Sequence, residues 1–258
     1  MKAVVFSGTT EGRELSRALA ELGAAVTVCV ASAYGEEEQG KTPGITVHTG
    51  PLSPEGKQTI LHDAAFCVDA THPYARHISA SVREACEKAG IQRLRLLRAQ
   101  SETEGFRSFP SAEEAAQWLA GREGNILLTT GTRELEAFRG ISPEKLYPRV
   151  LPSHRSLEAC EALGIPHRNI LALQGPFSRE MNAAMLRQYR IRYLVTKDGG
   201  EPGGFREKAE AAKETGVELI LISRPEETGL SYDEVLDMCR TLLEESGDKK
   251  RKNRGEEL

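Results

Sequence analysis

The sequence predicts an α/β fold of two successive Rossmann-like, doubly wound units with mainly parallel sheets and a cleft between them. Short, apolar, β-branched runs alternate with helical patterns along almost the whole chain of 258 residues. Such continuous runs are typical of parallel strands whose two faces are covered by helices. In addition, Gly, Thr, Asp and basic residues gather where the predicted strands end. Ligands of open α/β sheets bind at those strand ends.

In the first unit, apolar runs predict strands over residues 3–6, 25–30, 45–48, 66–69 and 94–97. Apolar residues at helical spacing predict helices over residues 11–22, 54–62 and 75–89. The strands and helices alternate, as in βαβ units, and this alternation predicts a parallel sheet.

The second unit repeats this pattern. Strands are predicted over residues 125–129, 145–150, 170–172, 192–196 and 218–222, and helices over residues 112–120, 156–163, 178–189, 205–215 and 232–244. Trp118 falls on the apolar face of its helix, which predicts a core position.

A polar, irregular stretch over residues 98–111 separates the two units. We therefore predict an N-terminal domain over residues 1–100 and a C-terminal domain over residues 101–244. Residues 245–258 carry charge blocks without apolar anchors, so we expect a disordered tail.

Composition narrows the class of protein. The net charge of −4 argues against a general nucleic-acid binder. The five cysteines include no C-x-x-C pair, which favours a reducing compartment without disulfides or a zinc ribbon. Neither a signal peptide nor an apolar run of membrane-spanning length is recognised. We therefore expect a cytoplasmic protein with no membrane partner.

The segment Phe6 to Arg13, which reads Phe-Ser-Gly-Thr-Thr-Glu-Gly-Arg, joins the first strand to the first helix. Unpaired N–H groups at a helix start favour a bound phosphate, and Gly8 allows close approach to the backbone. The turn departs from G-x-G-x-x-G because Thr10 replaces the second glycine. No Walker A sequence occurs, which argues against a P-loop ATPase. The turn predicts a nucleotide site, with a cofactor-free α/β turn as the alternative.

Residues after the second predicted strand indicate which nucleotide binds. In dinucleotide folds an Asp or Glu there bonds the ribose of NAD, but residues 31–33 contain no carboxylate. Ser32 offers a hydroxyl, and Arg13 has the charge to meet a 2′-phosphate. This favours NADPH over NADH, with NADH and a merely solvated Arg13 as the alternatives.

Five motifs occur together in order: residues 8–13 (GTTEGR), 69–75 (DATHPYA), 129–132 (TTGT), 174–178 (QGPFS), and 196–198 (TKD) with Gly203 and Gly204. This set resembles the precorrin-6A reductase family of cobalamin biosynthesis, over residues 1 to about 243. The resemblance implies two Rossmann-like domains with NADPH and the macrocycle bound between them. It also implies reduction of one double bond of precorrin-6A, or of cobalt-precorrin-6A, to the dihydro form.

The resemblance also assigns roles to residues of the first unit. It implies that the pyrophosphate and adenosine end of the cofactor is held by Gly8, Thr9, Thr10, Gly12 and Arg13. Ser32 is then expected near the 2′-phosphate, and Thr71, His72 and Tyr74 near the nicotinamide and its ribose. One departure is Gly199-Gly200, where we expect a small polar residue.

His72 and Tyr74 are our catalytic candidates. A histidine pKa near neutrality suits a proton donor, while a residue that only orients the cofactor, or a solvent proton, is the alternative. Asp69 is predicted to cap the following helix rather than to act as a base. His72 and His77 do not have the spacing of a helical metal pair, so no metal site is predicted.

The substrate implied by the resemblance is edged by carboxylates, which arginine binds well because it can donate to both oxygens. Our substrate-binding candidates, with solvated surface cations as the alternative, are Arg76, Thr130, Thr132, Arg133, Arg149, Lys197, Asp198, Gly203 and Gly204, and beside them Arg155 and Arg206. Gly203-Gly204 before Phe205 also predicts a second anion-accepting helix start, or else a plain loop.

Two other functions remain open: a generic two-domain NADPH reductase of another conjugated substrate, and a non-catalytic nucleotide-binding module. The sequence leaves undecided whether the substrate carries cobalt and what the oligomeric state is. Handover of the product to neighbouring pathway enzymes is compatible with this function.

Overall fold

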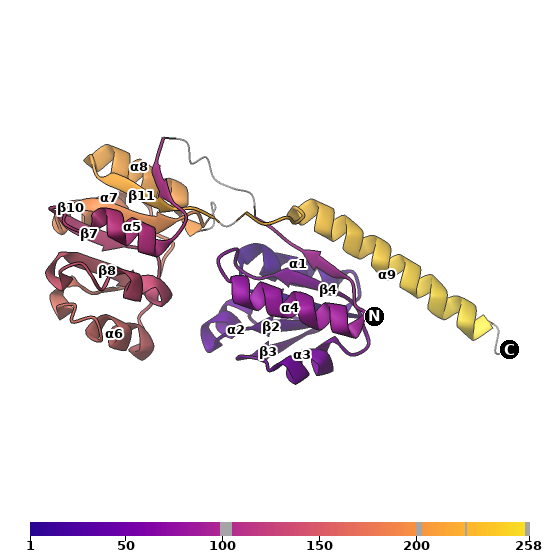
Figure 1. Cartoon of the computed structure of the whole chain (residues 1–258). Helices are drawn as coiled ribbons and strands as arrows, with labels where there is room; N and C mark the ends of the chain where they lie inside the picture. The colour runs from indigo at the N-terminus through magenta and orange to yellow at the C-terminus, as the bar shows by residue number, and fades with distance from the viewer. Residues whose placement is uncertain (99–104, 200–202, 225, 256–258) are drawn as a thin grey trace. The chain divides into compact units, whose positions relative to one another are not determined.

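The chain forms two compact units in the computed structural model, which describes residues 1–98, 105–199, 203–224 and 226–255 (Figure 1). Unit 1 comprises Met1–Ala99 and Glu226–Leu258, and unit 2 comprises Gln100–Pro225. Gly200 and residues 99–104 and 256–258, which entered the sequence predictions, lie outside the described residues. Each unit is an α/β fold with a parallel sheet, so the predicted fold class is confirmed.

Unit 1 contains a five-stranded sheet in the order β3-β2-β1-β4-β5. Its strands are β1 (Lys2–Ser7), β2 (Ala25–Val30), β3 (Ile45–Thr49), β4 (Ala64–Ala70) and β5 (Arg93–Arg95). Its helices are α1 (Thr10–Glu21), α2 (Ala33–Gln39), α3 (Pro54–Leu61), α4 (Arg76–Ala89) and α9 (Tyr232–Gly255). The one helix of this set that the sequence prediction omits is α2.

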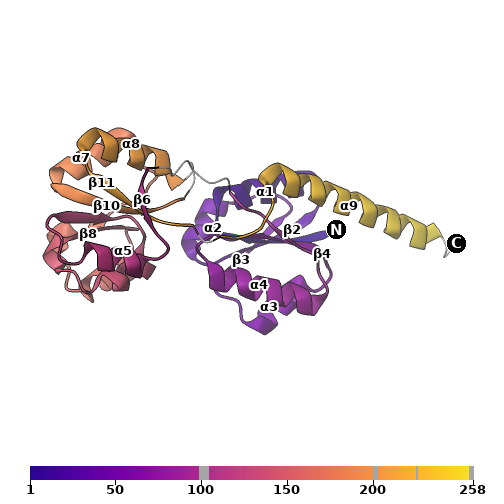
Figure 2. The same ribbon diagram turned by 45° about the horizontal axis from the view of Figure 1, so that its top comes forward.

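Alternating side chains of the unit 1 strands enter two separate cores. Val5 and Val28 pack with Leu15 of α1, and Val235 and Cys239 of α9 join the same cluster. The opposite side chains pack against α3 and α4 in a second cluster that contains Val4, Phe6, Leu61, Val82 and Cys86. Figure 2 shows α1 and α9 on one side of the sheet and α3 and α4 on the other. Both faces are therefore covered, as the continuous apolar strands require.

Helix α9 differs from the expectation in two ways. It packs on α1 and β4 of unit 1, whereas the sequence prediction had assigned residues 226–244 to the second domain. The reason is tertiary: Val235 and Cys239 complete the core of unit 1. The helix also continues to Gly255, so residues 245–255 are helical rather than disordered. Glu, Lys and Arg, which dominate that segment, have high helix propensity.

Unit 2 contains a six-stranded sheet in the order β6-β11-β10-β7-β8-β9. Its strands are β6 (Arg107–Phe109), β7 (Asn125–Leu128), β8 (Leu146–Val150), β9 (Leu171–Ala172), β10 (Ile191–Lys197) and β11 (Glu218–Ile222). Its α-helices are α5 (Ala112–Leu119), α6 (His154–Glu161), α7 (Arg179–Gln188) and α8 (Phe205–Thr215). Short 3₁₀ helices are η1 (Thr132–Phe138), η2 (Pro143–Lys145) and η3 (His167–Asn169).

One core of unit 2 lies between its sheet and α7 and α8, where Leu194 and Leu221 pack with Leu186 and Phe205. Trp118 of α5 is half-buried, and its ring packs edge-to-face on that of buried Tyr193 with the centroids 5.8 Å apart. Two guanidinium groups also lie over the ring, that of Arg107 at 4.5 Å and that of Arg122 at 3.7 Å from its centre. These cation–π contacts provide an alternative to burial for a large aromatic ring.

The strand orders define one switch point in each sheet. In unit 1 the chain runs from β1 outward through β2 and β3, then crosses to β4 on the other side of β1. In unit 2 it runs from β7 through β8 and β9, then crosses to β10 on the other side of β7. Ligands of such sheets bind outside the carboxyl ends of the strands at the switch point. The turns after β1 and β4 in unit 1, and after β7 and β10 in unit 2, are therefore the expected ligand-binding positions.

None of the described helices has the length and apolar character to cross a lipid bilayer. All five cysteines are free and buried.

Candidate functional site

The turn after β1 is organised by Thr9, the N-cap residue of α1. Its hydroxyl accepts a hydrogen bond from the N–H of Gly12 at 3.1 Å and donates one to the carbonyl oxygen of Ala70 at 3.3 Å. The first bond satisfies one unpaired N–H of the helix start, and the second ties the turn to the end of β4. Thr9 therefore joins the two strand ends of the switch point.

Gly12 and Gly8 allow the elements of this turn to approach closely. A Cβ on Gly12 would lie 2.8 Å from the Cβ of Ala70 and 3.0 Å from Oγ of Ser7, so no larger residue fits without displacement. A Cβ on Gly8 would lie 3.4 Å from the backbone nitrogen of His72. The two turns are thus close enough to contact one ligand, and α1 packs directly on the sheet, as in dinucleotide folds.

The second turn of the switch point contains Thr71, His72 and Tyr74, which follow β4. Thr71 is buried, while His72 and Tyr74 are half-buried. The N–H of Tyr74 points at Nδ1 of His72 with a nitrogen–nitrogen distance of 3.4 Å, and the two ring centroids lie 5.5 Å apart. The structure therefore brings our two catalytic candidates together beside the Gly8 turn.

Asp69, at the end of β4, is fully buried and holds this turn from beneath. Its Oδ1 accepts hydrogen bonds from the N–H and the hydroxyl of Thr71, at 3.1 Å and 2.7 Å. Its Oδ2 accepts from Ser79 at 2.6 Å and from Arg93 at 2.6 Å. Burial alone would raise the pKa of Asp69, but the charge of Arg95 and these hydrogen bonds outweigh burial, so the pKa is lowered.

The prediction that Asp69 caps α4 is wrong in detail. The N-cap residue of that helix is Ala75, which provides no side-chain hydrogen bond. Asp69 instead reaches Ser79 in the second turn of α4, because two arginines from β5 hold its carboxylate inside unit 1.

Arg13 is less available to bind a 2′-phosphate than the sequence suggests. Its guanidinium donates to the hydroxyl of Thr10 at 3.1 Å and lies 3.4 Å from the carboxylate of Glu38. Glu38 belongs to α2, the helix that sequence reasoning missed, and no local signal marks it as a partner of Arg13. Ser32 is the N-cap of α2 and accepts from the N–H of Gly35 at 3.3 Å. A carboxylate is therefore present near the end of β2, although not within residues 31–33.

Glu11 and Arg98 form a further ion pair beside α1. Both bonds, from Nε and Nη2 of Arg98 to the two carboxylate oxygens, measure 2.6 Å. Burial would raise the pKa of Glu11, but hydrogen bonding to Arg98 prevails and lowers it. Sequence reasoning did not single out this bidentate pair, because the two residues are far apart in the chain.

In unit 2 the switch point joins the turn after β7 to the end of β10. Thr129 donates its hydroxyl to the carbonyl oxygen of Val195 at 2.9 Å, and Lys197 forms an ion pair with Glu134 of η1. Thr130 is buried, and its Oγ1 has no hydrogen-bond partner within the described part of the chain. Thr132 begins η1. The candidates from both strand ends thus lie at one edge of this sheet.

Arg149 extends from β8, the neighbour of β7. Its Nη1 donates to the amide oxygen of Asn182 at 2.8 Å, and its guanidinium lies 4.5 Å from the ring centre of Phe177. Met185 provides a sulfur contact at 3.7 Å. These partners are neutral, and burial lowers the pKa of Arg149 to about 10. A half-buried cation with neutral partners has the chemistry to receive an anion.

Lys208 is buried near Arg149, and the sequence analysis did not identify it. Its ammonium donates to the carbonyl oxygen of Gly203 at 3.2 Å. Burial, and then the charge of Arg149, lower its pKa to about 7, against opposing effects of Glu207 and Asp198. Asp198 is also buried. Lys208 lies one turn inside α8, where its sequence context resembles any solvated helical lysine.

Gly203 and Gly204 precede α8, and Gly204 is its N-cap with a φ of +64°. The expected anion-accepting helix start has an acidic side chain in its first turn: Oε2 of Glu207 is buried, and a Cβ on Gly204 would lie 3.7 Å from it. A negative charge there already interacts favourably with the helix start. This arrangement disfavours a second anion at the same place.

The other cationic candidates are exposed. They are Arg76 at the start of α4, Arg133 in η1, Arg155 in α6 and Arg206 in α8, which pairs with Glu210 at 2.9 Å. Their exposure agrees with the alternative reading of solvated surface cations.

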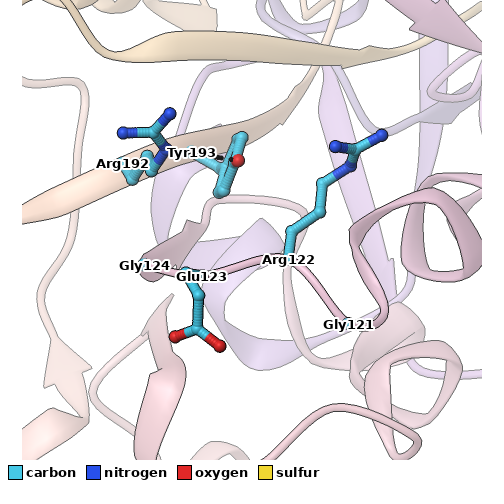
Figure 3. Close-up of a pocket in the computed structure, with 6 residues that line it drawn as sticks. All are labelled: Gly121, Arg122, Glu123, Gly124, Arg192 and Tyr193. Carbon is cyan, nitrogen blue, oxygen red and sulfur yellow. Dashed lines mark hydrogen bonds between the residues drawn. The ribbon is translucent and has the colours of Figure 1, made fainter.

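A hollow of about 590 Å³ in unit 2 lies away from this edge. It is lined by Gly121, Arg122, Glu123, Gly124, Arg192 and Tyr193. Figure 3 shows the ring of Tyr193 between the side chains of Arg192 and Arg122, with Glu123 directed elsewhere. These residues precede or begin β7 and β10, so the hollow lies at the amino ends of the strands. Ligands of such sheets bind at the carboxyl ends.

The described residues contain no group of three or more His, Cys, Asp or Glu side chains placed to hold a metal ion. The turn after β1 does fit a dinucleotide. Gly12 lets α1 pack directly on the strand ends, because a Cβ there would meet Ala70 and Ser7, and the start of α1 directs N–H groups outward.

Comparisons with known proteins agree with this geometry. The family model described as precorrin-6x reductase CbiJ/CobK matches residues 2–240. The cobalt-precorrin-6A reductase of Methanothermobacter thermautotrophicus is 36% identical over 88% of this chain and 77% of that protein. The enzyme of the same name from Priestia megaterium is 32% identical over 94% of this chain and 98% of that protein.

A solved structure titled CobK precorrin-6A reductase matches 94% of this chain and 97% of its own, with a TM-score of 0.74. Its sequence identity of 23% makes this a likeness of fold. The family match covers both units and nearly the whole chain, and it confirms the resemblance stated from the five motifs. The chain belongs to the precorrin-6x reductase family.

Proposed function

We propose that this protein reduces one double bond of cobalt-precorrin-6A, or of its metal-free counterpart, to the dihydro form, with NADPH as the reductant. The reaction is a step of corrin ring synthesis. Family membership supports the reaction, and the two relatives described above are named for the cobalt-containing substrate.

One structural observation carries the proposal. The glycine turn after β1 and the Thr71–Tyr74 turn after β4 meet at the switch point of unit 1. A Rossmann-like sheet binds its dinucleotide at that place, with the pyrophosphate at the helix start. Gly8, Thr9, Thr10 and Gly12 would then hold the pyrophosphate. Thr71 and His72 would lie toward the nicotinamide, because their turn borders the same crevice.

When bound, the coenzyme supplies a hydride, and the protein supplies position and charge. The contribution of this chain begins with a fixed turn: Asp69 holds Thr71, and the N–H of Tyr74 faces Nδ1 of His72. We assign to His72 the donation of a proton to the carbon next to the reduced one, with Tyr74 beside it. The donating species would be the imidazolium, which takes up its extra proton from solvent and returns to the neutral ring on donation. A solvent proton is the alternative.

Carboxylates on the macrocycle need cations that the protein does not already neutralise. Arg149 fits this role best, because its partners are the neutral side chains of Asn182, Met185 and Phe177. Lys197 is already paired with Glu134, so we assign it a smaller contribution to substrate binding. Thr130 offers at the same strand ends a buried hydroxyl that has no hydrogen-bond partner among the described residues.

The coenzyme preference is the finer part of the proposal. Arg13 and Ser32 favour the 2′-phosphate of NADPH, while Glu38 competes for Arg13. Because the pair with Glu38 is long and partly exposed, a phosphate with a larger charge would displace it.

The test is anaerobic incubation of the purified protein with NADPH and either cobalt-precorrin-6A or metal-free precorrin-6A. We expect loss of NADPH absorbance and a gain of two hydrogens in the macrocycle by mass spectrometry. NADPH oxidation only with other conjugated substrates would identify a generic reductase. NADPH binding without any reduction would identify a binding module instead.

A further inference from the structure

The chain passes between the units twice, and both passages are anchored in unit 1 near Arg95. The first passage follows β5, which contains Arg95, and the second precedes Glu227. Although 132 positions separate these two residues, Nε and Nη2 of Arg95 donate to the two carboxylate oxygens of Glu227 at 2.7 Å and 2.8 Å. Such a bidentate pair fixes both distance and orientation.

The third nitrogen of the same guanidinium faces the turn after β4. Nη1 of Arg95 donates to the carbonyl oxygen of Thr71 at 2.9 Å and to that of Asp69 at 3.0 Å. Arg95 is 5% exposed, so these bonds form in a site with little water. One planar group therefore holds the Thr71 turn on one edge and Glu227 on the other.

The returning segment is also fixed through its backbone. Leu230 donates its N–H to the carbonyl oxygen of Arg95, and Leu97 donates to that of Leu230, both at 2.8 Å. A Cβ on Gly229 would lie 2.8 Å from the carbonyl oxygen of Arg95 and 2.5 Å from Cγ of Leu97. The returning segment lies so close to β5 at Gly229 that a larger residue would displace it. The position of Glu227 is thus set by the chain around it.

We propose that Arg95 is a positioning residue for the reduction: it orients the Thr71–His72 turn and depends on Glu227, in the returning segment, for its own orientation. This inference rests on the proposed function for its kinetic consequence. Its structural part, that Glu227 and Arg95 together hold the turn, stands without it.

The role predicts a particular kinetic pattern. The pyrophosphate turn, Gly8 to Gly12, makes none of these contacts, so loss of Arg95 should leave most of the coenzyme affinity intact. The Thr71–His72 turn would lose its fixed orientation, and misplacement of groups near the reacting atoms lowers kcat by on the order of tenfold or more. The expected sign is a fall in kcat with little change in the Kd of NADPH.

The experiment compares Arg95→Met, Glu227→Gln and the control Arg93→Met. Arg93 bonds the same carboxylate of Asp69 but touches neither Thr71 nor Glu227. For each full-length protein we would measure kcat, the Kd of NADPH by fluorescence, the melting temperature, and hydrogen–deuterium exchange of residues 70–75 without ligand. Glu227→Gln removes only a charge from a partly exposed side chain, so it provides a folded variant if Arg95→Met does not fold.

We expect faster exchange of residues 70–75 and a lower kcat in Arg95→Met and, to a smaller degree, in Glu227→Gln. Arg93→Met should lower the melting temperature but reduce kcat less than Arg95→Met does, because Arg93 reaches the turn only through Asp69. Unchanged exchange in both test variants would overturn the proposal, as would an equal fall of kcat in the control. If the unaltered protein reduces neither macrocycle, the proposed function fails, while the exchange comparison still decides whether Arg95 and Glu227 hold the turn.

Discussion

Buried charge is handled differently in the two units. In unit 1 the buried carboxylate of Asp69 is enclosed by the guanidinium groups of Arg93 and Arg95, and Arg95 continues to Glu227. In unit 2 Arg149 contacts neutral partners, and buried Lys208 donates to a carbonyl oxygen. Both groups lie near the carboxyl ends of strands in sheets of the same architecture.

This difference separates two tasks. A buried charge that is fully paired rigidifies its surroundings, and in unit 1 those surroundings are the Thr71–His72 turn. A cation with neutral partners keeps part of its attraction for an outside anion, which suits the substrate-binding role proposed for Arg149 of unit 2. The comparison predicts that charge removal in unit 1 mainly affects stability and orientation, whereas in unit 2 it mainly affects substrate affinity.

The largest effect is expected for Asp69→Ala. Two buried or half-buried arginines would lose their shared carboxylate, and breaking a buried charge network in this way costs about 3–5 kcal/mol. Urea unfolding at neutral pH measures the free-energy change. Asp237→Ala, at an exposed aspartate of α9 paired with exposed Arg240, is the control and should be nearly neutral. If Asp69→Ala lowers the free energy of unfolding no more than the control does, then Asp69 does not hold a stabilising network with Arg93 and Arg95.

The next effect concerns Lys208 and pH. The pKa of Lys208 is about 7 in the folded protein, whereas the ordinary pKa of a lysine is 10.5. Between pH 7 and pH 10.5 the unfolded chain therefore binds more protons than the folded protein does. The contribution of Lys208 to stability therefore rises with pH across this window. Lys208→Met should be more stable than the unaltered protein at pH 7, by on the order of a few kcal/mol.

The stability difference between Lys208→Met and the unaltered protein should shrink as the pH approaches 9. Unfolding curves at several pH values check this, because subtraction of the two proteins cancels the other titrating groups. A difference that stays constant with pH would show that Lys208 keeps its charge in the folded protein. Lys213→Met, an exposed position of the same helix, is the matched control.

A smaller effect is expected for Arg149→Met, and it should appear in binding. Loss of one charge-assisted hydrogen bond to a substrate carboxylate costs about 1.5–3 kcal/mol, which is roughly a ten- to hundredfold increase in the KM of the macrocycle. The Kd of NADPH should not change. Arg155→Met, at an exposed arginine that follows the same strand, is the comparison. Equal KM values for both variants would remove Arg149 from the substrate site.

The smallest effect is expected at the pair Arg13–Glu38. Arg13→Ala should weaken NADPH more than NADH, while Glu38→Gln should strengthen NADPH, because it releases Arg13. Each change should be worth about 0.2–1 kcal/mol, as for exposed ion pairs. Glu37→Gln, the exposed neighbour, serves as control. An equal response of the two coenzymes to Arg13→Ala would exclude a contact with the 2′-phosphate.

Much of the fold could be predicted because apolar runs mark buried parallel strands well. What the sequence could not predict follows from weak local signals. Helix α2 lacks apolar periodicity and is held by Ser32 and by the bond from Thr49 to Glu36. Strand β6 is a short, polar edge strand that gains its identity only from pairing with β11. The assignment of α9 to unit 1 depends on packing that no local pattern shows.

The site divides in the same way. The turns at both switch points were predictable, because their residues follow strand ends. The partners of those residues were not: Glu38 for Arg13 and Glu227 for Arg95 are distant in the sequence, and a charged side chain alone does not indicate its partner. Lys208 could not be recognised either, because its burial arises from the surrounding fold.

The return of the chain to unit 1 affects how the protein is made. Val235 and Cys239 complete one core of the amino-terminal unit, yet the ribosome adds them after every residue of unit 2. The nascent unit 1 must therefore leave the part of this apolar face that α9 covers exposed during the synthesis of more than a hundred further residues, although α1 already packs on the same face. Translation that stops early would release chains with that face exposed, which would make them substrates for chaperones and proteases.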